Sequence, residues 1–503
     1  MAIVMGAGRK SVVLAGAAAV VYAAAAYVLA PLLLTRLPDG TAARLLADFS
    51  GTGRDGVLIL LVFGLVVPAF AALGPDRLSR TVGTATPRAL GAIRAWVATI
   101  LLASILWEDL ASSAYLPRSM MDSERHWLMG LLHELPIGFE RLLASHGGLL
   151  ILEYTTAMVL LCAVLGLFTR WAVPAGALLY LLCGAILRGY SWTYHTGVIP
   201  LYALLLLSFT PCGDGFSLDR MLRARRGLDV PSAEGARLRY GVGRFLVWMA
   251  IAIPYTLAGL SKLRNGGVLW WTGENMKQML VATIVEPMHF DFQLTFLLLR
   301  GPTWIFGLLG IAALASELAF VLVLVSRIAR TIIPALTAAM HVGIMLLQNI
   351  LFPDLIAIQA VFYDWRPLLR RFTRAVVIPG MDTAAPPGTD TAVVPGTAAL
   401  AGMHTAALPS LITRRQALVS RAFLVTAFVV WATRTEKFPL TAMQMFSREP
   451  QIDAVEYVTP WVVREDGTRA RALRAMDPRS GGHTLSPPAQ PVGGRAGQRR
   501  HAG

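Results

Sequence analysis

Residues 148–168 read GLLILEYTTAMVLLCAVLGLF, an apolar run in which Glu153 is the one charged residue. About 20 predominantly apolar residues form an α-helix long enough to cross the hydrocarbon core of a bilayer. Similar runs recur along the chain, and in lipid only helices and closed barrels satisfy every backbone hydrogen-bonding group. The sequence therefore predicts an all-α fold, a polytopic bundle of transmembrane helices.

The composition of the whole chain agrees with this reading. Of its 503 residues, 55% are hydrophobic and 15% are charged, whereas a soluble domain has about 25% charged residues. The net charge is +15, but the basic residues lie in short loops beside apolar runs, which is typical of topology signals and of contacts with anionic lipids. We therefore expect membrane lipids as partners and no nucleic acid. The three cysteines form no CxxC motif, so neither a disulfide framework nor a metal site is expected.

The apolar runs predict about eleven spans, followed by a short exoplasmic tail. Two further stretches, 120–146 and 274–300, have the amphipathic pattern of helices that lie at the membrane interface. The expected spans are 11–34, 56–74, 90–110, 148–168, 171–187, 195–211, 242–262, 303–326, 331–350, 353–366 and 417–433.

These spans divide the chain into five parts. They are N-terminal transmembrane helices (1–84), a main transmembrane domain (85–375), a linker (376–414), a last transmembrane helix (415–435) and an exoplasmic tail (436–503). The linker is rich in Ala, Pro, Gly and Thr, which predicts a flexible segment. The end of the tail has a composition typical of disorder.

The distribution of arginine predicts the orientation of the bundle. The most basic short loop, 212–241, is expected in the cytoplasm, because short cytoplasmic loops carry an excess of Arg and Lys. This choice also places the N-terminus, with Arg9 and Lys10, in the cytoplasm. Every other strongly basic short loop then lies on the same side.

Two sequence clusters fall at the exoplasmic ends of predicted spans. They are SWTYH (191–195) and YTLAGLSKL (255–263), so the topology brings His195 and Lys262 to one face. A lysine at a helix end commonly reaches the headgroups. However, only four of the 45 Lys and Arg residues are lysines, and lysine, unlike arginine, can lose its proton when desolvated. Lys262 is thus the candidate general base, while His195 is either an assisting group or a hydrogen-bonded interfacial histidine.

A third group consists of Glu317 and His341, which lie at similar depth in neighbouring antiparallel spans. Ionisable side chains inside a membrane are costly and need a reason. We expect these two to hydrogen-bond to each other, as a structural pair or as part of a binding site. No Walker A, GxGxxG, HExxH or GxSxG motif occurs, so soluble-type nucleotide and hydrolase chemistry has no support.

At these residues the chain resembles the vitamin K-dependent γ-carboxylase-like proteins, also called the HTTM (horizontally transferred transmembrane) domain family. The resemblance covers roughly residues 85–366. The matching pieces are SWxxH (Ser191, Trp192, His195), SLDR (217–220), AGLSKL (258–263) with Trp271 and Gly273 downstream, LGLFTRWA (165–172), MHVGIMLLQNILF (340–352) and, as in bacterial relatives, FPLTAMQMFSREP (438–450).

The resemblance implies a quinol-dependent, lyase-like site on the exoplasmic face of a multi-pass protein of a bacterial plasma membrane. In the carboxylases, a lysine matching Lys262 deprotonates reduced vitamin K. Oxygenation then yields a strong base that removes a γ-proton from a glutamate before CO₂ adds, and a histidine matching His195 assists. The residues expected to bind this quinol, a reduced vitamin K or menaquinone-type molecule, are Trp192, Tyr255, Ser261, His341 and Glu317.

The alternatives come from other functional classes. The vertebrate carboxylase grips its substrate with a large extramembrane region, and only a short tail follows the last predicted span here, so a peptide or protein substrate does not follow directly. A non-catalytic membrane protein that binds a lipid, a quinone or a protein partner is the second hypothesis. A transporter ranks third, because few charged residues line the predicted spans and the sequence shows no internal repeat of the kind that many transporters have.

Overall fold

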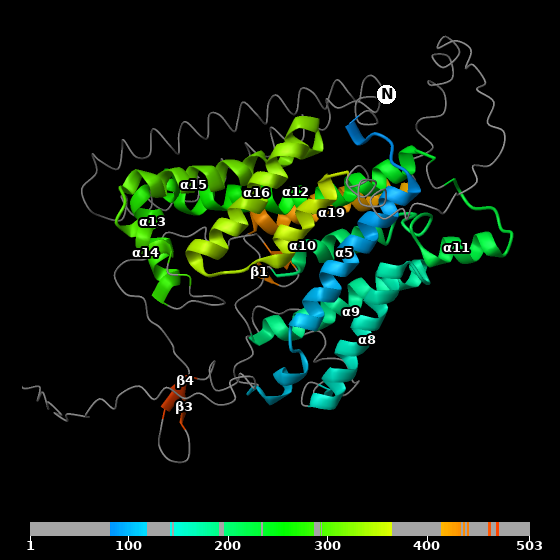
Figure 1. The fold of residues 1–503 in the computed structure, drawn as a ribbon, viewed down its shortest axis with the longest axis horizontal. Coiled ribbons are helices and arrows are strands. Elements are labelled where there is room, and N and C mark those ends of the chain that lie inside the picture. The colour runs from blue at the N-terminus through cyan, green and yellow to red at the C-terminus, as the bar shows by residue number, and fades with distance from the viewer. Residues whose placement is uncertain are drawn as a thin grey trace, which may run out of the picture. The chain divides into compact units, whose positions relative to one another are not determined.

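The computed structural model of the protein describes residues 81–117, 141–142, 145–190, 196–232, 235–285, 292, 294–364 and 414–433, together with four short strands between residues 436 and 471. The chain forms two compact units, Met1–Pro450 and Gln451–Gly503. The larger unit carries every helix of the described residues, and Figure 1 shows its helices.

The helices of the larger unit confirm the all-α prediction. In chain order they are α5 (Pro87–Trp107), η2 (Ala111–Tyr115), α8 (His146–Leu165), α9 (Thr169–Tyr190), α10 (Val198–Leu207), α11 (Leu218–Arg225), α12 (Leu238–Gly266), η4 (Gly267–Trp271), α13 (Gly273–Val285), α14 (Leu294–Leu299), α15 (Thr303–Leu318), η5 (Ala319–Leu324), α16 (Arg327–Gln348), α17 (Pro353–Ala357), η6 (Ile358–Phe362) and α19 (Arg414–Ala432).

The strands of the described residues form two small antiparallel hairpins. One pairs β1 (Glu436–Lys437) with β2 (Leu440–Thr441), and Lys437 faces Leu440 across it. The other belongs to the second unit and pairs β3 (Trp461–Val463) with β4 (Arg469–Arg471), in a register that sets Val462 opposite Ala470.

Six helical segments of the described residues are long and apolar enough to cross a membrane. They are Pro87–Tyr115, His146–Leu165, Thr169–Tyr190, Leu238–Gly266, Thr303–Leu324 and Arg327–Gln348. The predicted sixth, tenth and eleventh spans correspond to shorter apolar segments, Val198–Leu207, Pro353–Phe362 and, within α19, Leu418–Ala432. The predicted spans 11–34 and 56–74 lie outside the described residues, so the number of spans stays a prediction.

The predicted interfacial, linker and tail segments are described only in part. Most of 120–146 and the whole linker core, 376–412, lie outside the described residues, as does most of the tail. The stretch 274–300 contains α13 and α14. Helix α13 packs against α15 and buries Met276, Met279 and Leu280, so one face of this amphipathic helix contacts protein.

Helix α12 joins two groups of helices. On one side it packs against α10, which itself contacts α5 and α9; on the other side it packs against α15, η5 and α19. Its central part is buried almost continuously, because nearly every residue from Phe245 to Ala252 is apolar and meets a neighbouring helix. The residues of α12 that face α15 and α16 form one wall of the cavity described below.

Polar side chains cap the N-termini of several helices. Thr86, Ser145, Ser217 and Ser326 each accept a hydrogen bond from a backbone N–H in the first turn of the helix that follows. Gly166 ends α8 in the left-handed conformation, with a φ of 68°, which glycine adopts without steric cost.

Candidate functional site

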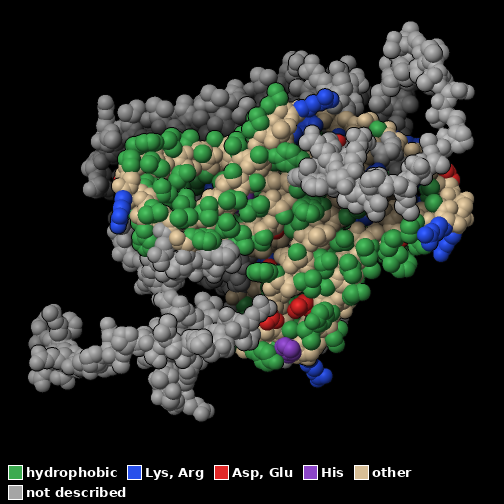
Figure 2. Space-filling view, in the orientation of Figure 1, with side chains coloured by type: hydrophobic (Ala, Val, Ile, Leu, Met, Phe, Trp, Pro, Cys, Tyr) green, Lys and Arg blue, Asp and Glu red, His purple; other side chains and the backbone are tan. Residues whose placement is uncertain are grey.

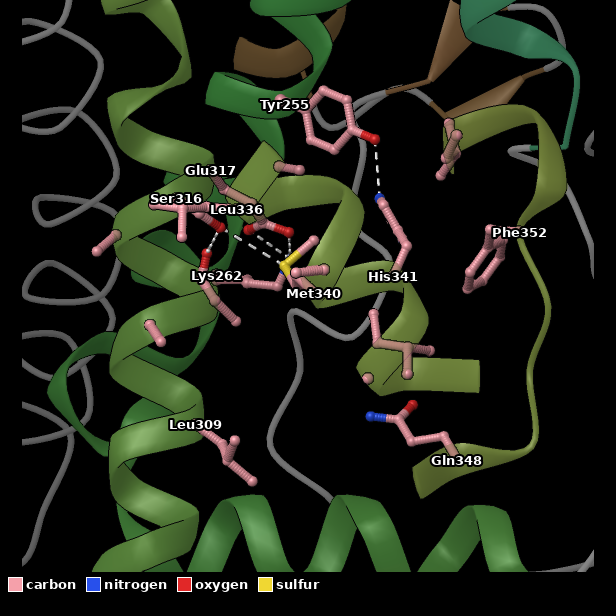
Figure 3. A pocket seen from close by; sticks show the side chains of 18 of the residues that line it. Tyr255, Lys262, Leu309, Ser316, Glu317, Leu336, Met340, His341, Gln348 and Phe352 are labelled. Carbon is pink, nitrogen blue, oxygen red and sulfur yellow. Dashed lines mark hydrogen bonds and ion pairs between the residues drawn. The ribbon is translucent and has the colours of Figure 1, made fainter. Parts of the chain in front are cut away.

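A cavity of about 650 Å³ lies among α12, α13, α15 and α16. Figure 3 shows its wall, to which Tyr255 and Lys262 contribute from α12, Glu317 from α15 and His341 from α16. Most of the other lining residues are apolar, among them Met276, Met279, Met340 and Phe352. A mostly apolar cavity with a few converging polar groups is the usual form of a small-molecule site.

The strongest interaction in the wall joins Lys262 to Glu317. The Lys262 ammonium nitrogen lies 2.7 Å from each carboxylate oxygen of Glu317, and the two side chains are 7% and 8% exposed. Lys262 Nζ also lies 5.4 Å from the centroid of the Trp270 ring, within the range of a cation–π contact. Lys262 therefore does not extend to a headgroup region; it is held inside the bundle.

Gly259 allows this pair to form. A Cβ atom at Gly259 would lie 3.0–3.1 Å from the side chain and backbone nitrogen of Leu318, so only glycine lets α12 and α15 approach this closely without displacement. Leu318 follows Glu317 directly, and Gly259 lies almost one helical turn before Lys262. The AGLSKL motif thus supplies both the charged group and the close approach that brings its partner to it.

The expected hydrogen bond between Glu317 and His341 is wrong. Glu317 pairs with Lys262, while His341 Nε2 lies 2.8 Å from the Tyr255 hydroxyl (Figure 3). Equal depth along two spans does not determine which way their side chains point around the helix axes, and α12 supplies the partner of each, Lys262 for Glu317 and Tyr255 for His341.

A chain of hydrogen bonds fixes the Tyr255 hydroxyl. Gln359 Nε2 donates to this hydroxyl at 3.1 Å and to the Leu355 carbonyl at 3.1 Å. Because the hydroxyl accepts from Gln359, its own proton is free to be donated to His341 Nε2. Stacking of the Tyr255 ring on Phe320, with centroids 4.6 Å apart, holds the phenol in place. When the hydroxyl donates in this way, the His341 imidazole is neutral and carries its proton on Nδ1; in the other tautomer Nε2 donates to the hydroxyl instead.

The cavity opens on an exposed apolar face between α15 and α16. Leu309 and Leu336 both line the cavity and are 36% and 54% exposed. Ala312, Ala315 and Ala339 are further exposed lining residues on the same two helices. Figure 2 shows hydrophobic side chains over this part of the molecule. An apolar molecule can therefore reach the cavity from the side, past these apolar residues of α15 and α16.

The remaining predicted site residues have separate positions. Ser261 is not among the cavity residues; it faces α19, where its hydroxyl accepts a hydrogen bond from the indole of Trp431 at 3.1 Å. Arg264 donates to the carbonyls of Trp431 and Ala432 at the end of α19. Trp192 and His195 lie outside the described residues, although Ile199, just after them, lines the cavity.

The SLDR motif has a structural role that its sequence did not reveal. The Asp219 carboxylate accepts hydrogen bonds from the backbone N–H groups of Phe168 and Thr169 at 2.8 and 2.7 Å. It therefore caps the start of α9 from another helix, and the favourable interaction of a carboxylate with a helix N-terminus adds to the bonds. The LGLFTRWA segment (165–172) and the SLDR segment (217–220) thus contact each other through these two hydrogen bonds.

Chemically, the wall can bind and transfer a proton. A lysine and a carboxylate in an apolar cavity can exist as an ion pair or, after proton transfer along the 2.7 Å contact, as a neutral amine and carboxylic acid. Removing both charges from water costs free energy. The ion pair is therefore less favoured over the neutral form here than it would be for the same two groups in water. Among the described residues, no group of three His, Cys, Asp or Glu residues could hold a metal ion.

Comparison with protein-family models, curated proteins and solved structures finds no match for the chain.

Proposed function

We propose that the protein is an integral membrane enzyme that binds a reduced isoprenoid quinone in this cavity and uses Lys262 as a general base. The observation that carries the proposal is the buried Lys262–Glu317 pair in the wall of an apolar cavity that opens between α15 and α16. The resemblance to the quinol-dependent carboxylases, with about eleven spans and an exoplasmic site, supplies the reaction class.

The cavity has features that suit a quinone head group. Its volume, about 650 Å³, falls within the roughly 300–1,000 Å³ of typical small-molecule sites. Its lining is apolar apart from the groups around Lys262 and His341 and from Gln348. Its opening between Leu309 and Leu336 would let an isoprenoid tail remain in the lipid.

When bound, a reduced quinone supplies an acidic hydroxyl and, with O₂, the oxidative chemistry of the reaction. Lys262 Nζ would accept the hydroxyl proton: the O–H bond breaks and an N–H bond forms. The amine is available for this only when the proton of the Lys262–Glu317 pair resides on Glu317. Glu317 is thus a positioning residue that sets how often the amine is neutral.

His341 and Tyr255 would orient the ring of the quinol. Both line the cavity, and the hydrogen bond between them leaves the Nδ1 of His341 without a partner. Packing of His341 against Phe352, with ring centroids 5.7 Å apart, restricts the imidazole further. Their role is to hold the reacting hydroxyl toward Lys262 and to exclude water from it.

A non-catalytic protein that binds a quinone or a lipid in the same cavity is the second candidate. The observation in its favour is that both carboxylate oxygens of Glu317 bond to Lys262, an arrangement that a purely structural pair would also adopt. The two candidates predict the same ligand and differ in whether it is consumed.

The test is to incubate the detergent-purified protein with reduced vitamin K or menaquinol in the presence of O₂ and CO₂. The enzyme proposal predicts loss of the quinol and formation of its epoxide, above a heat-denatured control. Saturable binding of the quinol without any epoxide would reject the enzyme and support the binding protein. Absence of both binding and turnover would reject both candidates.

A further inference from the structure

Two arginines from different helices converge on one buried indole, away from the cavity. Arg244 lies one turn before Trp248 on α12, and Arg330 lies in the first turn of α16. The guanidinium carbon of each is 4.6 Å from the centroid of the Trp248 ring. Both contacts are well within the distance of a cation–π interaction.

The structure holds these three side chains in place. Trp248 is buried, its N–H reaches the Val361 carbonyl at 3.5 Å, and its ring stacks on Phe362. Arg330 Nε donates to the Val323 carbonyl at 2.7 Å. Arg244 donates through Nη2 to the Thr84 carbonyl at 3.2 Å. Each guanidinium has five N–H donors, so most of them are not used by these bonds.

No carboxylate pairs with either guanidinium among the residues that the structure describes. The charged side chains that interact with these two guanidinium groups are also arginines. Arg330 repels Arg244, and Arg327 repels Arg330. Other arginines of the chain differ in this respect. Arg188 pairs with Glu108, and Arg239 pairs with Asp214.

The position at the start of α16 makes this concentration of positive charge less favourable still. The N-terminus of a helix carries the positive end of the helix dipole, so cations in the first turn are disfavoured there and anions are favoured. Arg327 and Arg330 both lie in that turn. An anion bound between the guanidinium groups would offset the mutual repulsion and the unfavourable interaction with the dipole.

We propose that Arg244 and Arg330, beside Trp248, form a binding site for a phosphate group. The planar fork of a guanidinium matches the oxygens of a phosphate, and two forks held against one ring provide several charge-assisted hydrogen bonds. The phosphate can belong to the headgroup of an anionic phospholipid or be a free phosphate ion. This site is separate from the cavity and does not depend on the function proposed for it.

The experiment measures the thermal stability of the detergent-purified protein during titration with phosphatidylglycerol, phosphatidylcholine or inorganic phosphate. We expect phosphatidylglycerol or phosphate, but not phosphatidylcholine, to raise the melting temperature of the wild type. Arg244→Gln and Arg330→Gln should each weaken the apparent affinity about tenfold, because each removes charge-assisted hydrogen bonds. The double variant should lose saturable binding.

The arms of the titration identify the ligand and test the site. An arginine-dependent shift with phosphatidylglycerol alone identifies a lipid headgroup, and one with inorganic phosphate identifies a free phosphate. Arg225→Gln is the matched control, since Arg225 is an exposed residue at the end of α11, and it should keep the wild-type shift. Equal shifts in the wild type and the double variant, or an equal loss in Arg225→Gln, would overturn the proposal.

A charge-preserving variant covers the case in which the Gln variants do not fold. Arg244→Lys/Arg330→Lys keeps both positive charges but loses the guanidinium forks and their stacking. The proposal predicts a clearly weaker affinity for the phosphate ligand in this variant, at an unchanged net charge. An unchanged affinity would show that only diffuse charge attracts the ligand, and the site would be rejected.

Discussion

The interaction between Lys262 and Glu317 can be tested by a double-mutant cycle on folding stability. The single variants are Lys262→Met and Glu317→Leu, which remove one charge each at roughly constant volume, and the third variant combines them. Both side chains are less than 10% exposed, and the nitrogen lies 2.7 Å from both oxygens. Each single change therefore leaves the other charge without its partner inside the bundle.

The expected magnitudes follow from this burial. Removing one member of a buried ion pair destabilises a protein by about 3–5 kcal/mol, whereas replacing both members with apolar residues is often neutral or stabilising. We therefore expect each single variant to lose several kcal/mol and the double variant to recover most of that loss. The coupling energy should be much larger than the roughly 0–1 kcal/mol of an exposed pair.

The assay is reversible denaturation of the detergent-purified variants, followed by circular dichroism or by tryptophan fluorescence. The matched control is Arg223→Gln, which removes the ion pair with Asp214, where the shortest N–O distance is 3.7 Å and the arginine side chain is 39% exposed; it should change the stability by less than about 1 kcal/mol. Additive losses in the Lys262/Glu317 cycle would show that the two side chains do not pair in the folded protein, which would refute the geometry of the site.

Three further predictions test other parts of the structure. Ala312→Trp, at the exposed opening of the cavity, should abolish quinone binding while the melting temperature stays near the wild-type value; retained affinity would show that ligands enter elsewhere. Asp219→Ala should destabilise the protein by about 1–2 kcal/mol in denaturant titrations, because α9 loses its cap at Thr169, and a change below 0.3 kcal/mol would contradict that role. For orientation, Arg226→Cys in a cysteine-free background should resist an impermeant maleimide in intact cells and react after permeabilisation; labelling in intact cells would reverse the topology.

The native Cys212 is not suitable for that topology experiment. It lies in the basic loop 212–241 but is buried, and its thiol contacts the Leu207 carbonyl at 3.5 Å. Burial also raises the pKa of the Cys212 thiol, so little reactive thiolate is present at neutral pH. Absence of labelling at this position would therefore reflect packing rather than location, and an exposed position on the same loop is needed.

The sequence predicted the long helices well because their signal is local. The runs 90–110, 148–168 and 242–262 correspond to α5, α8 and α12 within a few residues. The boundary of α12 matters for function, because the helix continues to Gly266 and then folds back through η4 and α13. The apolar pattern places Lys262 at the exoplasmic end of a span, whereas this continuation of the helix buries it inside the bundle.

The partners inside the bundle could not be predicted from apolar patterns alone. Such patterns give the depth of a residue along its span, whereas pairing depends on which helices are neighbours and how each is rotated about its axis. The close approach at Gly259 sets both for Glu317. The glycine in AGLSKL was the available signal, but nothing in one sequence indicates that Leu318 is the residue that packs against it.

The central claim, that Lys262 is a general base for a quinol bound in the cavity, is tested most directly by the turnover of Lys262→Arg. Arginine keeps the positive charge and can still pair with Glu317, but it cannot give up its proton at ordinary pH. The variant should fold and bind the quinol like the wild type, and its rate of quinol oxidation should fall to the level of the uncatalysed reaction. A rate equal to that of the wild type, at matched folding and binding, would contradict the claim.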